Sequence, residues 1–133
     1  KYISRNGRVD GYYSGYTFAN QLGVTTQVPY MVEIVSNNAS ARVREVNLHG
    51  RRVLLRKARV LVTKENYRIL QFLDFLKDID QYADENDKIL SDRIRKYVVD
   101  VQIKKTEIDC YIKQYPDRIY RYIYEMRLYD VFA

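Results

Sequence analysis

Residues 63–80 read TKENYRILQFLDFLKDID, and their apolar side chains recur at the intervals of an α-helix. The apolar residues cover most of the helix circumference: Ile69, Leu70, Phe72, Leu73, Phe75, Leu76 and Ile79. A narrow polar stripe remains, formed by Arg68, Gln71, Asp74 and Asp78. A helix this apolar packs on several sides, so we expect it at the centre of the hydrophobic core. Thr63 is the expected N-cap, because its hydroxyl can accept a hydrogen bond from a free N–H of the first turn.

Shorter elements surround this helix. Residues 14–22 place apolar side chains along one face of a short helix. Residues 29–36 are rich in β-branched side chains, and His49-Gly50 is typical of a tight hairpin corner. The last third of the chain returns to helical spacing. We therefore predict an α+β fold: a small, mainly antiparallel sheet over about residues 29–62, a short N-terminal helix, and a C-terminal set of about four helices.

The length and composition favour one globular domain that spans residues 1–133. Hydrophobic residues make up 47% of the chain and charged residues 30%, as in ordinary globular proteins. No apolar run approaches the length of a membrane span, so we expect no membrane partner. A single cysteine, Cys110, excludes an internal disulfide and favours a reducing, cytoplasmic location.

The positive charge is concentrated in one segment. Residues 42–64 hold eight basic residues against Glu45 alone, a net charge of +7, while the whole chain carries +6. Seven of the basic residues fall on the predicted strands or beside them: Arg42, Arg44, Arg51, Arg52, Arg56, Lys57 and Arg59. Alternate side chains of a strand share a face, so several could converge on phosphates or carboxylates. The segment predicts a site for DNA, RNA or an acidic protein; a solvated sheet face, whose arginine stems cover apolar surface, is the alternative.

The chain has fourteen tyrosines and no tryptophan. In the last predicted helix, Tyr120, Tyr124 and Arg127 fall on one stripe opposite the apolar face. Exposed tyrosine and arginine are common anchors of protein interfaces, which is the interpretation we favour for this stripe. Stacking on nucleic-acid bases is the second interpretation. Burial in a dimer or against another part of a longer protein is the third.

The sequence carries few of the groups that catalysis requires. One histidine, His49, and one cysteine do not supply a set of metal ligands or a catalytic triad. The glycines of residues 11–15 (GYYSG) lack the pattern of a phosphate-cradling loop. We therefore expect neither a metal nor a cofactor, and no enzymatic activity. A nuclease-like site of Glu33, Glu45 and Lys57 is the arrangement we rank last.

Residues 11–64 resemble the C-terminal domain of AbiEi-type antitoxins and their relatives. Four stretches carry the resemblance: residues 14–16 (SGY), residues 20–29 (NQLGVTTQVP), the basic strand at residues 51–59, and residues 63–66 (TKEN). The helical second half of the chain matches that family only in general character. The resemblance implies a short helix followed by basic strands.

The resemblance also implies a function. Members of that family are bacterial antitoxins of abortive-infection toxin–antitoxin systems; they neutralise a nucleotidyltransferase-like toxin and repress their own operon by binding DNA. They carry an N-terminal winged helix that this chain lacks, so we expect it to be the C-terminal domain of a longer protein. The expected role is non-catalytic partner binding with auxiliary basic contacts to nucleic acid. A stand-alone nucleic-acid-binding module is the alternative. The sequence does not indicate an oligomeric state.

Overall fold

A four-stranded mixed sheet forms one half of the molecule, with the strand order β3-β4-β6-β5. The strands are β3 (Gly11–Tyr13), β4 (Val32–Ser36), β5 (Val43–Leu48) and β6 (Arg51–Lys57). The computed structural model describes residues 1–82 and 87–133. Strand β4 pairs antiparallel with β3 and parallel with β6, while β5 and β6 form an antiparallel hairpin. The predicted α+β class and mainly antiparallel sheet are confirmed, with one parallel pair at the centre.

The hairpin corner lies where the sequence places it. His49 and Gly50 join β5 to β6 with φ angles of 51° and 80°. Two consecutive residues with positive φ give the turn whose twist matches that of paired strands. The sheet also begins earlier than residue 29, because residues 11–13 form its fourth strand. A separate two-stranded ribbon precedes it, formed by β1 (Ser4–Arg5) and β2 (Arg8–Val9).

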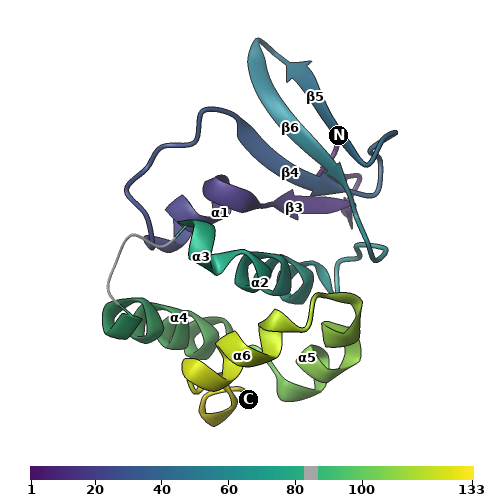
Figure 1. Cartoon of the computed structure of the whole chain (residues 1–133). Helices are drawn as coiled ribbons and strands as arrows, with labels where there is room; N and C mark the ends of the chain where they lie inside the picture. Colours follow the sequence, from purple (N-terminus) through teal and green to yellow (C-terminus); the bar gives the residue numbers. More distant parts are fainter. Residues whose placement is uncertain (83–86) are drawn as a thin grey trace.

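The helices form the other half of the molecule, and α2 lies between the sheet and the remaining C-terminal helices (Figure 1). The six α-helices are α1 (Gly15–Leu22), α2 (Tyr67–Lys77), α3 (Ile79–Tyr82), α4 (Asp87–Val101), α5 (Lys105–Tyr111) and α6 (Arg118–Glu125). Two short 3-10 helices, η1 (Ile112–Gln114) and η2 (Leu128–Asp130), follow α5 and α6. None of the described helices combines the length and apolar character that crossing a bilayer requires.

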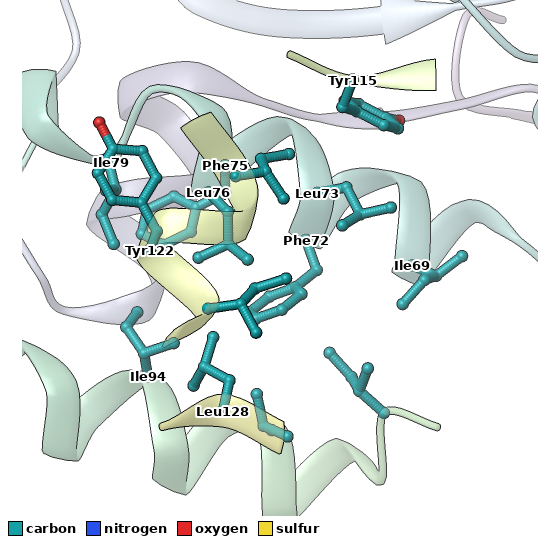
Figure 2. Packing of buried hydrophobic residues seen from close by; sticks show 14 of the residues in the cluster. Ile69, Phe72, Leu73, Phe75, Leu76, Ile79, Ile94, Tyr115, Tyr122 and Leu128 are labelled. Atoms are coloured by element: carbon teal, nitrogen blue, oxygen red, sulfur yellow. The ribbon is translucent and has the colours of Figure 1, made fainter. Parts of the chain in front are cut away.

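Helix α2 is the centre of the hydrophobic core, as its sequence predicts. Phe72, Leu73 and Leu76 are completely buried. Figure 2 shows side chains of α2 packed against Ile94 of α4 and Leu128 of η2, among others. Side chains of α1 and β3 pack on the sheet-facing side of the same cluster. The helix therefore joins the two layers.

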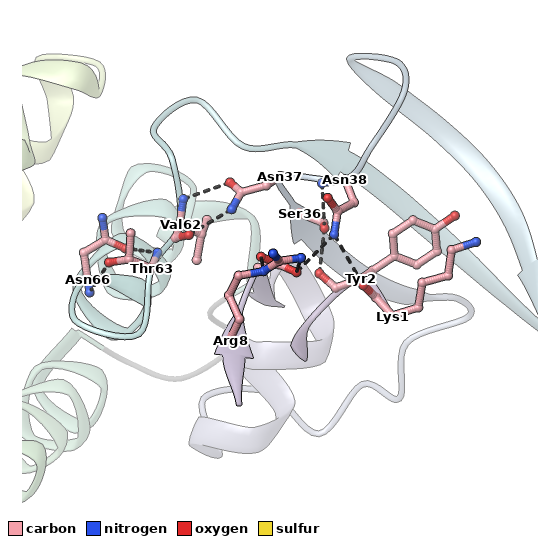
Figure 3. A network of polar contacts seen from close by, with 10 residues as sticks. Lys1, Tyr2, Arg8, Ser36, Asn37, Asn38, Val62, Thr63 and Asn66 are labelled. Carbon is pink, nitrogen blue, oxygen red and sulfur yellow. Dashed lines mark hydrogen bonds and ion pairs between the residues drawn. The ribbon is translucent and has the colours of Figure 1, made fainter. Parts of the chain in front are cut away.

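Side-chain hydrogen bonds fix the start of α2 relative to the sheet (Figure 3). The Asn37 side chain, just after β4, donates to the Val62 carbonyl and accepts from the Val62 N–H, both at 2.8 Å. The side chains of Thr63 and Asn66 each accept the backbone N–H of the other, at 3.2 and 2.7 Å. The predicted N-cap at Thr63 is wrong: residues 64–66 form a turn, and Asn66 occupies the N-cap position of α2, while the Thr63 carbonyl accepts the N–H of Tyr67.

Candidate functional site

The seven basic residues that the sequence singles out are all exposed, but they do not share one face. Arg56 is paired in register with Val35, which belongs to the core around α2. By strand alternation, Arg52 and Arg56 therefore lie on the face that the helices cover. Arg44, Arg51 and, at the end of β6, Lys57 lie by the same alternation on the opposite face, which carries a smaller apolar cluster that includes Ile34, Val53 and Leu55.

Four of the seven come together at one end of the hairpin. Arg42 immediately precedes β5, Arg59 follows β6, and Lys57 ends β6. The Lys57 N–H donates to the Arg42 carbonyl at 3.0 Å, which holds these two ends side by side. Arg42, Arg56, Lys57 and Arg59 all line one cavity of about 370 Å³ between the sheet and the helices. We call this space the interlayer cavity.

The helices supply the opposite wall of the interlayer cavity. Asp74, Lys77 and Asp78 come from α2 and the residue that follows it, and Tyr82 comes from α3. Tyr82 packs edge-on against Tyr16 of α1, with ring centroids 5.0 Å apart. The cavity therefore has a basic wall on the sheet side and a mixed wall of carboxylates, a lysine and aromatic rings on the helix side.

The start of α1 and strand β4 close the inner end of the cavity. Ser14 N–H donates to the Glu33 carbonyl at 2.9 Å, and Tyr16 N–H donates to the Glu33 carboxylate at 2.8 Å. The carboxylate thus satisfies a free N–H of the α1 N-terminus. A Cβ on Gly15 would lie 2.3 Å from this carboxylate, and Gly15 has φ of +54°. The positive φ favours glycine there, and any larger residue would also push the end of the Glu33 side chain away from the Tyr16 N–H.

Three of the cavity cations lack partners. Within residues 1–82 and 87–133, Arg42, Arg56 and Lys57 make no side-chain hydrogen bond or ion pair. Arg59 and Arg52, by contrast, have partners. Arg59 donates to the Gln114 carbonyl at 2.9 Å, and Arg52 pairs with Glu45 at 2.6 Å.

The remaining three arginines of the hairpin differ from those that line the cavity. Arg52 also stacks on Tyr30 and donates to its hydroxyl at 2.8 Å. Its hydrogen bond to Glu45 lowers the pKa of that carboxyl. Arg44 donates to the Ser40 hydroxyl at 2.7 Å, while Arg51 stands exposed beside the turn. Arg44, Arg51 and Arg52 lie outside the interlayer cavity.

Asp74 is the most deeply buried carboxyl of the cavity wall. Its side chain is 14% exposed, it accepts a hydrogen bond from the Tyr12 hydroxyl, and it lies 3.9 Å from the Lys77 ammonium. Burial raises the pKa of Asp74 above its ordinary value of 3.8, against the lowering effects of Tyr12 and Lys77. Burial likewise raises the pKa of the Tyr12 hydroxyl. These two groups hold β3 and α2 together at the edge of the cavity.

The tyrosine stripe on the last helix is exposed but shorter than expected. Tyr120 and Tyr124 lie one turn apart on α6, with 42% and 82% of their surface accessible. Arg127 lies beyond the end of α6 with φ of +55° and pairs with Asp130 at 3.0 Å. The left-handed backbone ends the helical register before Arg127, so the arginine does not continue the stripe.

Carboxylates and histidine do not gather in the described part of the chain. No group of three or more His, Cys, Asp or Glu side chains there is placed to hold a metal ion. Glu33 is engaged with the start of α1, and Glu45 pairs with Arg52. His49 lies in the hairpin turn, exposed to solvent.

Sequence reasoning missed part of the cavity. Ser14, Lys77 and Tyr82 were not among the predicted site residues, because each reads locally as a capping, surface or core residue. Asp74 stood out only as a polar position in an otherwise apolar helix. Its place in the polar stripe of the helix does not reveal its partners, since the partners of a buried polar group are set by tertiary contacts.

Comparison of the chain with protein-family models, with curated proteins and with solved structures gave no match.

Proposed function

We propose that this chain is the partner-binding domain of an AbiEi-like antitoxin or transcriptional regulator and acts without catalysis in the bacterial cytoplasm. Its partners would be a nucleotidyltransferase-like toxin and, through auxiliary basic contacts, DNA. The class rests on the resemblance of residues 11–64. The binding surface rests on the charge and exposure of the basic residues around β5 and β6.

One observation supports this proposal most strongly. Arg42, Arg56 and Lys57 are exposed, gather at one end of the sheet, and have no anionic partner within residues 1–82 and 87–133. Unpaired cations that lie close together repel one another, and an external anion relieves this repulsion. A phosphate backbone or a cluster of carboxylates on a protein would serve.

A DNA-binding measurement tests the polyanion part of the proposal. Fluorescence anisotropy with a labelled 20-base-pair duplex should show affinity that falls steeply as salt rises, because each phosphate contact releases counterions. The double variant Arg51→Glu/Arg56→Glu should bind at least about tenfold more weakly. Lys96→Glu reverses one charge on α4, on the far side of the helical layer, and should change binding by less than about twofold, which is less than either Arg51→Glu or Arg56→Glu alone (Figure 1).

A co-expression experiment tests the antitoxin part. A nucleotidyltransferase-like protein encoded beside the gene for this chain should stop bacterial growth, and co-expression of this chain should restore growth. Tyr124→Ser removes an exposed ring of α6 and should weaken the rescue if this surface contacts the toxin. Growth arrest that persists despite co-expression would contradict the antitoxin assignment.

The alternative, a stand-alone nucleic-acid-binding module, predicts a different combination of results. Salt-dependent binding to DNA or RNA would remain, and no neighbouring toxin would be neutralised. The same unpaired cations support this alternative, because phosphate contacts require cations but no particular protein surface. The two experiments together therefore separate the two functions.

A further inference from the structure

The interlayer cavity combines two features that surface charge alone does not explain. Three cations without partners line it, and a buried hydroxyl without a partner lines it too. We propose that this cavity binds a phosphomonoester of about the size of a mononucleotide. This inference goes beyond the proposed function, since it concerns a small-molecule site and requires neither a toxin nor duplex DNA.

The charge of the cavity favours a phosphomonoester. Arg42, Arg56, Lys57 and Arg59 line its sheet side, and the strand register turns the Arg56 side chain toward the helices. A phosphomonoester carries close to two negative charges near neutral pH, whereas a backbone phosphodiester carries one. Guanidinium groups bind phosphate oxygens through pairs of parallel hydrogen bonds, and lysine contributes a compact charge. A terminal phosphate therefore matches this wall better than an internal phosphate of a nucleic acid.

The helix-side carboxylates are already engaged within the protein. Asp78 pairs with Lys77 and lies 3.0 Å from Arg118, and Asp74 accepts the Tyr12 hydroxyl. The Glu33 carboxylate accepts the N–H of α1 described above. Because each carboxylate has an internal donor, the cations of the opposite wall remain available to a ligand.

Ser14 supplies the second, independent observation. The residue is 7% exposed, and its Oγ is the buried side-chain polar atom that lacks a hydrogen-bond partner in the described ranges. Ser14 occupies the N-cap position of α1 but makes no capping hydrogen bond with its side chain. The Glu33 carboxylate takes the adjacent N–H instead. Buried hydroxyls in folded proteins normally have partners, and a turn of the Ser14 side chain toward the cavity would let an oxygen of a bound ligand serve as that partner.

The size and the apolar part of the cavity limit the ligand. A volume of about 370 Å³ lies within the range of small-molecule sites. Tyr16 and Tyr82 offer ring surfaces, and Val35 and Val43 add aliphatic ones. These surfaces suit a sugar or a base attached to the phosphate. The space is too small for a duplex, so the ligand is a free phosphomonoester or the phosphorylated end of a single strand.

Isothermal titration calorimetry on the full 133-residue chain tests the proposal. The probes are inorganic phosphate, ribose 5-phosphate, the four ribonucleoside 5′-monophosphates, adenosine, and a tetranucleotide with and without a 5′-phosphate. At least one phosphomonoester should bind with 1:1 stoichiometry and a Kd below about 1 mM, and adenosine should not bind. If no phosphomonoester binds, the proposal is wrong. Tighter binding of the phosphorylated tetranucleotide than of any free monophosphate would identify a strand end as the source.

Three variants locate the bound phosphate. Arg56→Gln should weaken binding at least about tenfold, because a charge-assisted contact is lost. Ser14→Ala should weaken it about threefold to tenfold. Arg51→Gln removes an equal charge at the hairpin tip, outside the cavity, and should leave the affinity unchanged. Equal losses for Arg51→Gln and Arg56→Gln, or no loss for Ser14→Ala, would place the ligand on the general basic surface and overturn the cavity site.

Nuclear magnetic resonance of the unaltered protein gives a readout that does not depend on a variant folding. Titration with the tightest phosphomonoester should shift the backbone amide signal of Gly15 at the inner end of the cavity. An unshifted Gly15 signal at saturation would contradict binding there. Duplex-DNA binding should survive Ser14→Ala, so a failed cavity proposal and a failed polyanion proposal give different results.

Discussion

Helix α2 and the β5–β6 hairpin are elements of similar size, but the rest of the protein surrounds α2 whereas most of the hairpin is exposed to solvent. Six of the eleven residues of α2 are buried, and packing surrounds the helix on both the sheet side and the helix side. In β6, two of seven residues are buried, and Figure 1 shows the hairpin extending away from the helices. Stability is thus concentrated around α2, while the hairpin presents charge to solvent. The interlayer cavity lies where the two regions meet.

The largest expected effect lies at the centre of α2. Phe72 is fully buried and stacks on Tyr97, with ring centroids 5.9 Å apart. Phe72→Ala should lower the free energy of unfolding by about 3–5 kcal/mol, because it removes apolar contacts and leaves a cavity. Urea denaturation followed by circular dichroism measures this loss. Phe72→Leu is the control and should cost less, since it keeps most of the volume. A loss below about 1 kcal/mol for the alanine variant would contradict the central role of α2.

The next effect lies at the boundary between the two regions. Gly15→Ala should destabilise the protein by about 1–2 kcal/mol, because the residue has positive φ and the new methyl group displaces the Glu33 carboxylate from the Tyr16 N–H. In a Glu33→Ala background the Gly15→Ala change should cost less stability, because the contact with the carboxylate is gone and only the strain of the positive φ remains. Denaturation of the two single variants and the double variant measures the difference. Strictly additive losses of stability in the two single variants and the double variant would show that the cost of Gly15→Ala does not depend on the Glu33 side chain.

Asp74 should give a smaller, pH-dependent effect. Its pKa in the folded protein is raised above 3.8, so the unfolded chain ionises first as pH rises. The folded state therefore loses stability as pH rises from the unfolded pKa through the folded pKa. Asp74→Asn, which keeps an acceptor for Tyr12, should raise the free energy of unfolding at pH 7 by on the order of 1 kcal/mol. The gain should shrink as pH falls toward 4.

Asp78→Asn is the matched control for this experiment. It makes the same chemical change four residues later, but it removes a carboxylate that pairs with Lys77 and Arg118. It should therefore lower stability at pH 7 rather than raise it. Urea denaturation of both variants between pH 4 and pH 7 gives the comparison. A destabilised Asp74→Asn at neutral pH would show that its contacts with Tyr12 and Lys77 outweigh the cost of burial.

The smallest effect on stability is expected at the tip of the hairpin. Arg51 is exposed and lies on the sheet face away from α2. Arg51→Glu should change the free energy of unfolding by less than about 0.5 kcal/mol, as is usual for exposed positions. Thermal unfolding checks this value, and the DNA titration described above checks whether affinity falls in the same variant. A change in stability comparable to that of Phe72→Ala would remove the contrast between the two regions.

The predictable parts of the fold are those that depend on local periodicity. The apolar spacing of residues 63–80 was enough to predict the core helix, although the helix begins at Tyr67 with Asn66, and not Thr63, in the N-cap position. His49-Gly50 was enough to predict the turn, since few residue pairs adopt two positive φ angles. The parallel pairing of β4 with β6 was not predictable in this way. It depends on which strand lies next to β4 across a long connection, and strand propensity carries no information on that choice.

The candidate site shows the same division. The sequence identified the arginines of residues 42–59 but treated them as one patch. Strand alternation places Arg51 and Arg56 on opposite faces, and the cavity gathers Arg56 with Arg42 and Lys57. This grouping follows from how the end of the hairpin meets the helices, since strand alternation alone would place Lys57 on the face of Arg51. The partner of Asp74 is Tyr12 of β3, which lies far away in the chain, so naming it required the position of β3 against α2.

The sequence by itself determined the α+β class, the core helix, the hairpin turn and the concentration of positive charge. Each of these follows from side chains within a few residues of one another, whose spacing and charge are read directly. The tertiary structure alone decided which cations remain without partners, why glycine is favoured at position 15, and why Ser14 lacks a hydrogen bond. These features arise where the sheet and the helices meet, and their contacts join residues that are distant along the chain.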